Sequence, residues 1–244
     1  MENIKKATVG SFVANDYRAA SVFQKYGSDF CCRGGISIEE VSHNHNIDAE
    51  LLISELQEAV NQPNNEGIDF RTWPLDLLAD YIEKTHHRYI VRTVPALNQY
   101  LDKLCEVHGE NHPELFLIAE AFATAASNLG AHMIKEEKVL FPVIRKMVEA
   151  KSNGEVLVKS ELGTVENPIA VMMQEHDAEG ERFRTIAHLS NNYTTPADGC
   201  RTYQVAFETL KEFESDLHKH IHLENNILFP KAVLLETEFS RFSN

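Results

Sequence analysis

The sequence has no long apolar run and no concentrated basic segment. No stretch of eighteen consecutive apolar residues occurs, so a membrane-spanning helix is not expected. Residues 1–8 lack the apolar core of a signal peptide, which makes the cytoplasm the expected location. The formal net charge is −14, and because phosphate binding needs a concentrated basic surface, a nucleic-acid partner is not expected.

Cysteine is scarce, and the chain lacks the common metal and redox motifs. The four cysteines are Cys31, Cys32, Cys105 and Cys200. No Cys-x-x-Cys occurs, which excludes zinc ribbons and thioredoxin-like redox motifs. His-Glu-x-x-His, the motif of many zinc hydrolases, is absent as well. Cys105 and Cys200 have no motif around them and are expected to be packing residues.

The adjacent pair Cys31–Cys32 leaves two interpretations open. In the first, the cysteines are small apolar residues in a tight turn formed with Gly34 and Gly35. In the second, they are an exposed and partly ionised thiol pair that transfers iron or exchanges electrons, with a pKa lowered by Arg33 or by a helix N-terminus. A structural disulfide is not expected, because the ring closed between neighbouring cysteines is strained.

The first quarter of the chain predicts a small helical domain. Residues 1–62 carry short helical patterns, in which Ser37–Glu40 is a capping box and Asp48 is a second helix cap. Residues 63–73 are rich in Asn, Pro and Gly and are predicted to be a linker. Strand-like alternation is nearly absent, and residues 155–158 are the one short candidate strand.

Residues 74–240 carry four long helical patterns. They cover about 74–105, 111–150, 167–191 and 197–236. Asn167 and Pro168 are expected to be the N-cap and first residue of the third helix. Pro142 and Pro230 are expected to kink or stop the second and fourth helices. Long helices with short connections predict an all-α, antiparallel four-helix bundle.

Two eleven-residue segments in this region share five identical residues at matched positions. Residues 132–142 and 220–230 both read His-x-x-x-Glu, followed at matched offsets by Leu-Phe-Pro. Side chains four residues apart lie on one face of a helix, so each segment offers an imidazole and a carboxylate to the same point. A salt pair between His and Glu explains one copy but not the repeated identities. Two such helices face to face predict a two-metal site formed by His132, Glu136, His220 and Glu224.

The other two helices are expected to complete the site with one imidazole each. The third offers His176, and the first offers His86 or His87; adjacent helical residues point about 100° apart, so only one of the two should face the core. Iron accepts such a mixture of imidazole and carboxylate ligands. The pair Glu83 and His86 also fits a ferritin-like Glu-x-x-His motif, but that fold needs a second copy, which is missing.

The remaining histidines are expected to lie outside the site. His222 should be exposed or in an outer shell around the metal ligands. Surface positions are expected for His43, His45, His108, His112, His188 and His218.

The chain resembles the RIC (repair of iron centres) family of di-iron proteins that repair iron–sulfur clusters, over essentially its whole length. The segments that carry the resemblance are Asp29–Gly35, His132–Pro142, Glu175–Asp177 and His220–Pro230. The resemblance implies a hemerythrin-like bundle that holds two non-haem irons, bridged by oxo and carboxylate groups. Counting back eight residues from Pro95 places the family's first-helix ligand on His87. The implied metal ligands are His87, His132, Glu136, His176, His220 and Glu224.

The resemblance also implies a function and partners. The expected role is repair of iron–sulfur clusters damaged by oxidative or nitrosative stress, by donation of iron. The partners would be damaged iron–sulfur proteins, with nitric oxide or O2 as small ligands. A nitric oxide reductase, and a module that only binds O2 or nitric oxide, are the alternatives. The oligomeric state stays open, a homodimer included.

Overall fold

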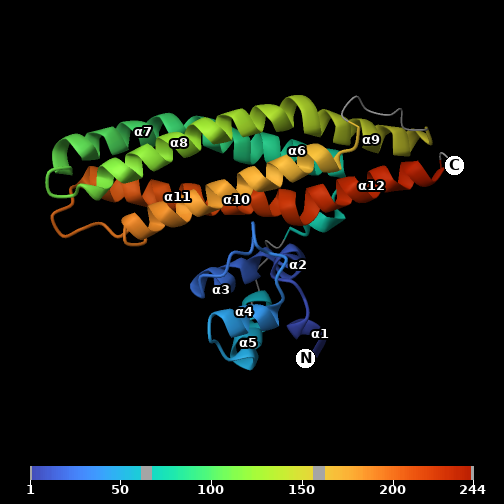
Figure 1. Cartoon of the computed structure of the whole chain (residues 1–244), viewed down its shortest axis with the longest axis horizontal. Coiled ribbons are helices and arrows are strands. Elements are labelled where there is room, and N and C mark those ends of the chain that lie inside the picture. Colours follow the sequence, from blue (N-terminus) through green and yellow to red (C-terminus); the bar gives the residue numbers. More distant parts are fainter. Residues whose placement is uncertain (1, 62–67, 156–162, 243–244) are drawn as a thin grey trace. The chain divides into compact units, whose positions relative to one another are not determined.

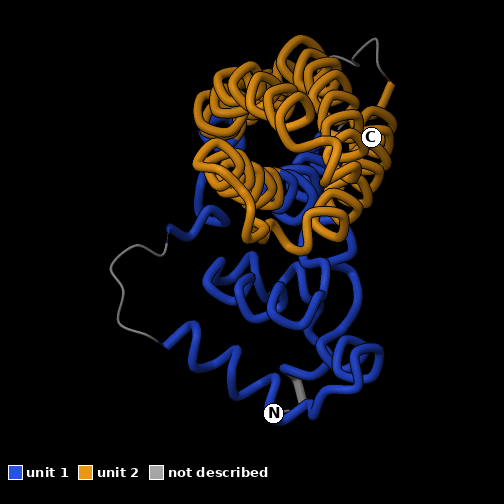
Figure 2. Tube along the Cα trace, turned by 90° about the vertical axis from the view of Figure 1, so that its left-hand side faces the viewer, with its two compact units in different colours: residues 1–78, 221–244 blue, residues 79–220 orange. Residues whose placement is uncertain are grey.

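The computed structural model describes residues 2–61, 68–155 and 163–242. In these ranges every regular element is a helix, and the one β-bridge is isolated, between Thr8 and Ser37. The all-α prediction is therefore confirmed, while the candidate strand lies outside the described residues except for Glu155. The chain divides into two compact units: residues 1–78 with 221–244 (unit 1), and residues 79–220 (unit 2) (Figure 2).

Unit 2 is a bundle of long helices (Figure 1). Its elements are η3 (Ile82–His87), α7 (Arg88–His108), α8 (Glu114–Lys135), η4 (Glu136–Leu140), α9 (Phe141–Asn153), α10 (Glu166–Leu189) and most of α11 (Arg201–Leu223). Successive helices run in opposite directions, and α8 packs against both α7 and α10. Phe122, Phe183 and Phe213 meet in the core, with ring centroids 5.3 Å and 5.6 Å from that of Phe213. Apolar residues at helical spacing thus form the core between the helices.

Two helix starts differ from the prediction. The third long helix, α10, begins at Glu166, so Asn167 lies in its first turn and is not the N-cap. The fourth, α11, begins at Arg201 rather than at residue 197. The N–H of Gly199 instead donates to the carbonyl of Pro196 at 2.9 Å, which closes a turn before the helix starts.

Wide π-helical turns precede the two prolines of the repeated segments. In η4 the N–H of Phe141 donates to the carbonyl of Glu136, and η5 (Glu224–Leu228) has the same bond from Phe229 to Glu224. Because proline cannot donate to the preceding turn, the wider turn accommodates the missing hydrogen bond. Both helices continue beyond the proline, as α9 and α12 (Phe229–Phe242). The prolines therefore distort the helices, as expected, but do not end them.

Unit 1 combines the N-terminal helices with the end of the chain. Its elements are α1 (Glu2–Lys5), α2 (Val9–Asn15), η1 (Tyr17–Ala19), α3 (Ala20–Lys25), α4 (Ile38–Asn44), α5 (Ala49–Asn61), η2 (Phe70–Thr72), the start of α6 (Leu75–Tyr81), η5 and α12. The capping box is confirmed, since Ser37 Oγ accepts from the Glu40 N–H at 3.1 Å and Glu40 Oε2 accepts from the Ser37 N–H at 2.6 Å. Asp48 caps α5 as expected.

The predicted linker lies partly within the described residues. Residues 63–67 lie outside them, whereas Phe70–Thr72 form the helical turn η2 with Phe70 buried.

None of the helices in the described ranges has both the length and the hydropathy that a membrane crossing needs.

Candidate metal centre

Five of the six predicted ligands lie in unit 2, and the fold brings them together. They come from four continuous helices. His87 ends η3, His176 lies in α10 and His220 lies in α11, while His132 in the last turn of α8 and Glu136 at the start of η4 share one helix. All five are buried, with no more than 3% of any residue exposed. Three π-helical turns are found at predicted ligands, a distortion that is frequent at functional sites.

Glu136 lies between two groups of histidines. Its Oε2 is 3.4 Å from Nε2 of His87, and its Oε1 is 3.2 Å from Nε2 of His132. Nε2 of His176 in turn lies 2.9 Å from Nε2 of His132. Ligand atoms of His87, Glu136 and His220 fall within 4.8 Å of one another, and so do those of His132, Glu136 and His176. One carboxylate is thus shared by two clusters, each of which can hold a metal ion.

This arrangement fits metal ions better than an apolar core. A fully buried carboxylate is costly unless a cation or hydrogen bonds compensate it. Metal–nitrogen bonds of about 2.1 Å at a right angle separate two nitrogens by about 3.0 Å, close to the 2.9 Å between His132 and His176. Imidazole and carboxylate together suit iron. The donor set and its spacing therefore fit the implied metal.

Two carboxylates for which no role was predicted orient the histidines. Nδ1 of His87 lies 3.0 Å from Oε1 of Glu137, and Nδ1 of His132 lies 2.8 Å from Oε2 of Glu175. Both contacts leave Nε2 directed to Glu136, the pattern in which a carboxylate fixes a metal-binding imidazole. The role of Glu137 could have been predicted from its position in the sequence, because it directly follows the predicted ligand Glu136.

Glu175 is itself held by Lys135. The two side chains form an ion pair next to the hydrogen bond from Glu175 to His132. Burial acts to raise the pKa of Glu175, but hydrogen bonds from Lys135 and His132 outweigh it and leave the pKa below the usual value. Glu175 is therefore a carboxylate at neutral pH and can accept the imidazole N–H.

The structure corrects the expectation that only one of His86 and His87 faces the core. Both are buried, but only His87 joins the clusters. Nδ1 of His86 lies 2.9 Å from Oδ1 of Asp216, and its ring stacks on that of His220 with the centroids 5.7 Å apart. The flank of the site is closed by α11, so a side chain that points away from the metal ligands is still covered.

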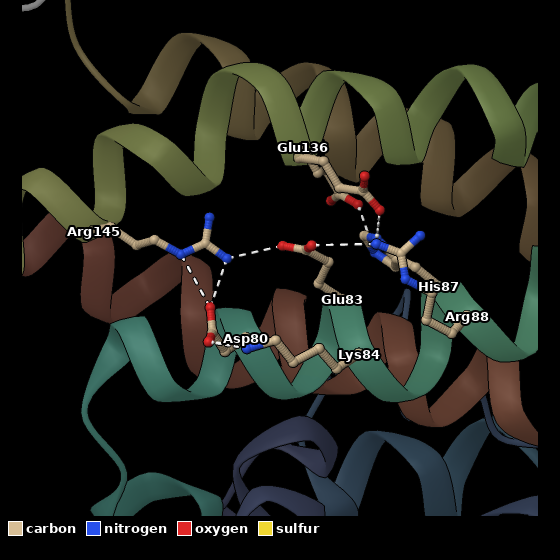
Figure 3. Close-up of polar contacts among 8 residues, drawn as sticks. Asp80, Glu83, Lys84, His87, Arg88, Glu136 and Arg145 are labelled. Atoms are coloured by element: carbon tan, nitrogen blue, oxygen red, sulfur yellow. Dashed lines mark hydrogen bonds and ion pairs between the residues drawn. The ribbon is translucent and has the colours of Figure 1, made fainter.

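Glu83 has a structural role beside the site (Figure 3). Arg145 lies 2.9 Å from Oε2 of Glu83 and 2.8 Å from Oδ1 of Asp80, and it ties α9 to α6 and η3. Glu83 also pairs with Arg88 at 3.4 Å. It is therefore used in ion pairs, which agrees with the rejection of a ferritin-like Glu-x-x-His pair.

The sixth predicted ligand, Glu224, belongs to unit 1. It follows His220 by four residues on a helix that continues from α11 into η5, just as Glu136 follows His132. The residue is fully buried.

A cavity of about 250 Å³ reaches the cluster between α8 and α10. The polar side chains that line it are Asn128, His132, Lys135, Glu175, His176 and Glu179. The ion pair of Lys135 and Glu175 therefore lies on the wall of a space that leads to His132 and His176.

Known proteins share both parts of the chain. Residues 78–232 match the hemerythrin HHE cation binding domain, and residues 5–60 match a domain of unknown function, DUF542. The iron-sulfur cluster repair protein ScdA of Staphylococcus haemolyticus is 30% identical over 226 residues, which are 93% of this chain and 97% of ScdA. The chain belongs to the family of iron–sulfur cluster repair proteins.

Two further relatives from this repair family are similar to the chain over nearly its whole length. The iron-sulfur cluster repair proteins YtfE of Enterobacter sp. and of Citrobacter koseri are each 32% identical over 225 residues, 92% of this chain and 96% of each relative. The predicted family and its hemerythrin-like bundle are thus confirmed. The buried His and Glu clusters are able to hold metal ions, as a cation binding domain requires.

The cysteine pair of this repair-family chain differs from the second interpretation given above. Cys31 is buried and Cys32 only half-buried. A hydrogen bond with Cys32, together with burial, raises the pKa of Cys31 well above its usual range. The expectation of an exposed thiol with a lowered pKa is therefore wrong for Cys31, because the loop packs its side chain inside unit 1.

Two other side chains also differ from the expectation. Cys200 is exposed and is no packing residue; hydrogen bonds from His108, whose Nε2 lies 3.2 Å from its sulfur, and from the backbone N–H groups of Tyr203 and Thr202 lower the thiol pKa to about 7. For His222 only the exposed alternative is wrong: its ring packs against the rings of Tyr17 and Phe30, and burial lowers its pKa to about 4. Contacts with residues far away in the chain decide both cases.

Proposed function

We propose that the chain repairs iron–sulfur clusters damaged by oxidative or nitrosative stress, and that it does so by donating iron. The observation that carries the proposal is Glu136, a buried carboxylate shared by two histidine clusters, in a chain whose relatives are named iron-sulfur cluster repair proteins. The partners would be proteins with damaged iron–sulfur clusters.

The proposed centre contains two irons. Its ligands would be His87, His132, Glu136, His176, His220 and Glu224, with the two glutamates as bridges. Glu224 is included because its spacing from His220 repeats that of Glu136 from His132, on a continuous helix and with a fully buried side chain. When bound, the irons would supply exchangeable ferrous ions and a redox-active centre.

The surrounding residues support a site that holds its ligands firmly while it stays accessible. Glu137 and Glu175 fix the imidazoles of His87 and His132 and keep Nε2 directed to Glu136. The cavity between α8 and α10 offers an entrance to the same histidines. Lys135 adds a positive charge at this entrance and is neutralised by Glu175.

The cavity favours a second candidate function. Its volume of about 250 Å³ leaves room for a diatomic molecule next to His132 and His176. A nitric oxide reductase or a module that binds O2 or nitric oxide would use such a space. In that case the irons would remain in the protein during function, whereas a donor must lose them.

The test is reactivation of an enzyme whose iron–sulfur cluster nitric oxide has damaged. Wild type, Glu136→Gln and the control Glu181→Gln are compared, since Glu181 lies on the exposed face of α10. We expect about two irons per chain in wild type and in the control, and restored enzyme activity only with these two. Loss of iron and of rescue in Glu136→Gln is expected because the shared carboxylate is gone.

Iron donation has its own test. Reduced protein is mixed with a competing chelator, and the iron that remains in the chain is measured. Retention of both ferrous ions, with nitric oxide consumption intact, would favour the reductase over the donor. A colourless protein with stoichiometric zinc would refute both.

A further inference from the structure

A second cluster of metal-binding side chains lies in unit 1. Ligand atoms of Asp29, Cys31 and Cys32 all fall within 4.8 Å of one another. The two sulfurs are 3.7 Å apart, and Sγ of Cys31 is 3.2 Å from Oδ1 of Asp29. The sulfur–sulfur distance is well beyond a disulfide bond of about 2.05 Å. Two thiols and a carboxylate thus share one small space.

The distances resemble the edges of a tetrahedral metal site. With metal–sulfur bonds of about 2.3 Å and metal–oxygen bonds of about 2.1 Å, the sulfur–sulfur edge is about 3.8 Å and the sulfur–oxygen edge about 3.6 Å. The observed 3.7 Å matches the first edge, and the observed 3.2 Å is slightly shorter than the second. A metal ion could bind here with only small movements of the side chains.

Hydrogen bonds between side chains and backbone groups hold this loop in place. Oδ1 of Asp29 accepts hydrogen bonds from the N–H groups of Cys31 and Cys32, at 3.0 Å and 2.8 Å. Nδ2 of Asn225 donates to the carbonyl of Cys31 at 3.2 Å, and Nδ2 of Asn226 donates to that of Phe30 at 3.3 Å. A loop fixed in this way binds a ligand at low entropic cost.

The close packing behind the loop depends on glycine. A Cβ atom on Gly34 would lie 2.6 Å from the carbonyl oxygen of Phe30 and 2.9 Å from Cα of Gly10. The turn interpretation of the cysteine pair accounts for this glycine. It also accounts for the Asp29 carboxylate as a backbone acceptor, but it does not require two sulfurs next to that carboxylate.

We propose that Asp29, Cys31 and Cys32 bind one divalent transition-metal ion, ferrous iron in the cell, with a fourth coordination position left open. Two metal–sulfur bonds form while the two thiols release their protons to solvent, and no electron is transferred. Thiolate ligands select borderline and soft metals such as Fe(II) and Zn(II) over Mg(II) or Ca(II). An open position would allow the ion to be passed on.

The location of this site suggests its use. Asn225, which holds the carbonyl of Cys31, is the neighbour of Glu224 in η5. The same segment of unit 1 therefore carries a predicted iron ligand and anchors the cysteine loop. The site would hold an iron ion on its way to a damaged cluster, a role that rests on the proposed function, whereas the metal site itself does not.

Cobalt(II) is the probe, because tetrahedral cobalt–thiolate sites give intense visible bands that His and Glu ligands alone do not produce. The full-length, iron-loaded protein carries Cys105→Ser and Cys200→Ser, so that its only thiols are Cys31 and Cys32. We expect about one cobalt per chain with these bands. Adding Cys31→Ser and Cys32→Ser should abolish the bands.

Asp29→Asn is the second variant, because an amide oxygen preserves the acceptor for the two N–H groups while the charge is lost. We expect it to fold like wild type and to bind cobalt at least about tenfold more weakly. Thiolate bands that persist without both cysteines, or cobalt affinity unchanged in Asp29→Asn, would overturn the proposal.

Iron in the bundle is counted in the same samples, which separates this inference from the proposed function. Absence of the cobalt bands from protein that keeps its bundle iron and its rescue activity refutes only the site in unit 1. Cobalt bands that remain in Glu136→Gln, which has lost bundle iron, support a site that is independent of the bundle.

Discussion

The thiol of Cys200 offers a sharp test of the surface of unit 2. It is exposed, and its pKa is lowered to about 7, chiefly by the hydrogen bond with Nε2 of His108 at 3.2 Å and further by the backbone N–H groups of Tyr203 and Thr202. The two residues come from the start of α11 and the end of α7. The perturbation is His108→Ala, which removes the hydrogen bond to the thiolate and leaves the cysteine exposed.

The expected magnitude follows from the two pKa values. At pH 7 about half of Cys200 would be thiolate, against about 3% for an ordinary thiol with a pKa of about 8.5. A thiolate of lower pKa is less nucleophilic, by about fivefold for this difference. If the variant reached the ordinary pKa, wild type would react about threefold faster at pH 7 and about sixfold faster at pH 6. Above pH 9 both thiols are ionised, and the variant would react up to about fivefold faster. The backbone hydrogen bonds of Tyr203 and Thr202 remain in the variant, so these ratios are upper limits.

The assay is alkylation by iodoacetamide as a function of pH, with each cysteine followed by mass spectrometry of its peptide. The half-maximal rate at Cys200 should lie near pH 7 in wild type and should move toward about pH 8.5 in His108→Ala. His188→Ala, which alters an exposed histidine elsewhere on the bundle, is the control and should leave the profile unchanged. Rate profiles for wild type and His108→Ala that never cross would refute the assigned role of His108.

Three more predictions concern the core, the centre and the loop. Phe213→Ala should lower the free energy of unfolding by about 3–5 kcal/mol, whereas the exposed Leu234→Ala should stay within about 0.5 kcal/mol, as measured by urea denaturation; similar effects would contradict the described core. Glu175→Gln should weaken iron binding by about 10–100-fold in chelator competition, and unchanged binding would exclude it as an orienting residue of His132. Gly34→Ala should cost about 1–3 kcal/mol, because its Cβ would meet a carbonyl oxygen at 2.6 Å; an unchanged melting temperature would argue against this packing.

Local patterns in the sequence determined most of the fold. Helices form from contacts within a few residues, so apolar spacing, the capping box at Ser37 and the cap at Asp48 predicted real helices. The repeated His-x-x-x-Glu segments placed His132 and Glu136 on one helix face, which the structure brings to the same cluster as His176. The domain bounds 1–62, 63–73 and 74–240, a cytoplasmic location and a homodimer stay predictions.

Helix starts were harder to predict than helix centres. The start of α11 was placed too early because Pro196 looks like a first helical residue, whereas a turn to Gly199 forms there. Pro142 widens its helix into a π-helical turn and does not end it, since the bundle core stabilises the helix on both sides. Competition between local preference and packing decides such boundaries.

The sequence by itself determined the helices, the paired His-x-x-x-Glu segments and the family, because these depend on spacing along one chain. Only the tertiary structure decided which neighbours each side chain meets. It assigned Glu137 to His87 and Glu175 to His132, buried His86 against Asp216, and placed His108 beside Cys200. These partners lie 43 to 130 residues apart in the chain. Burial and pKa depend on such distant contacts, which no local pattern encodes.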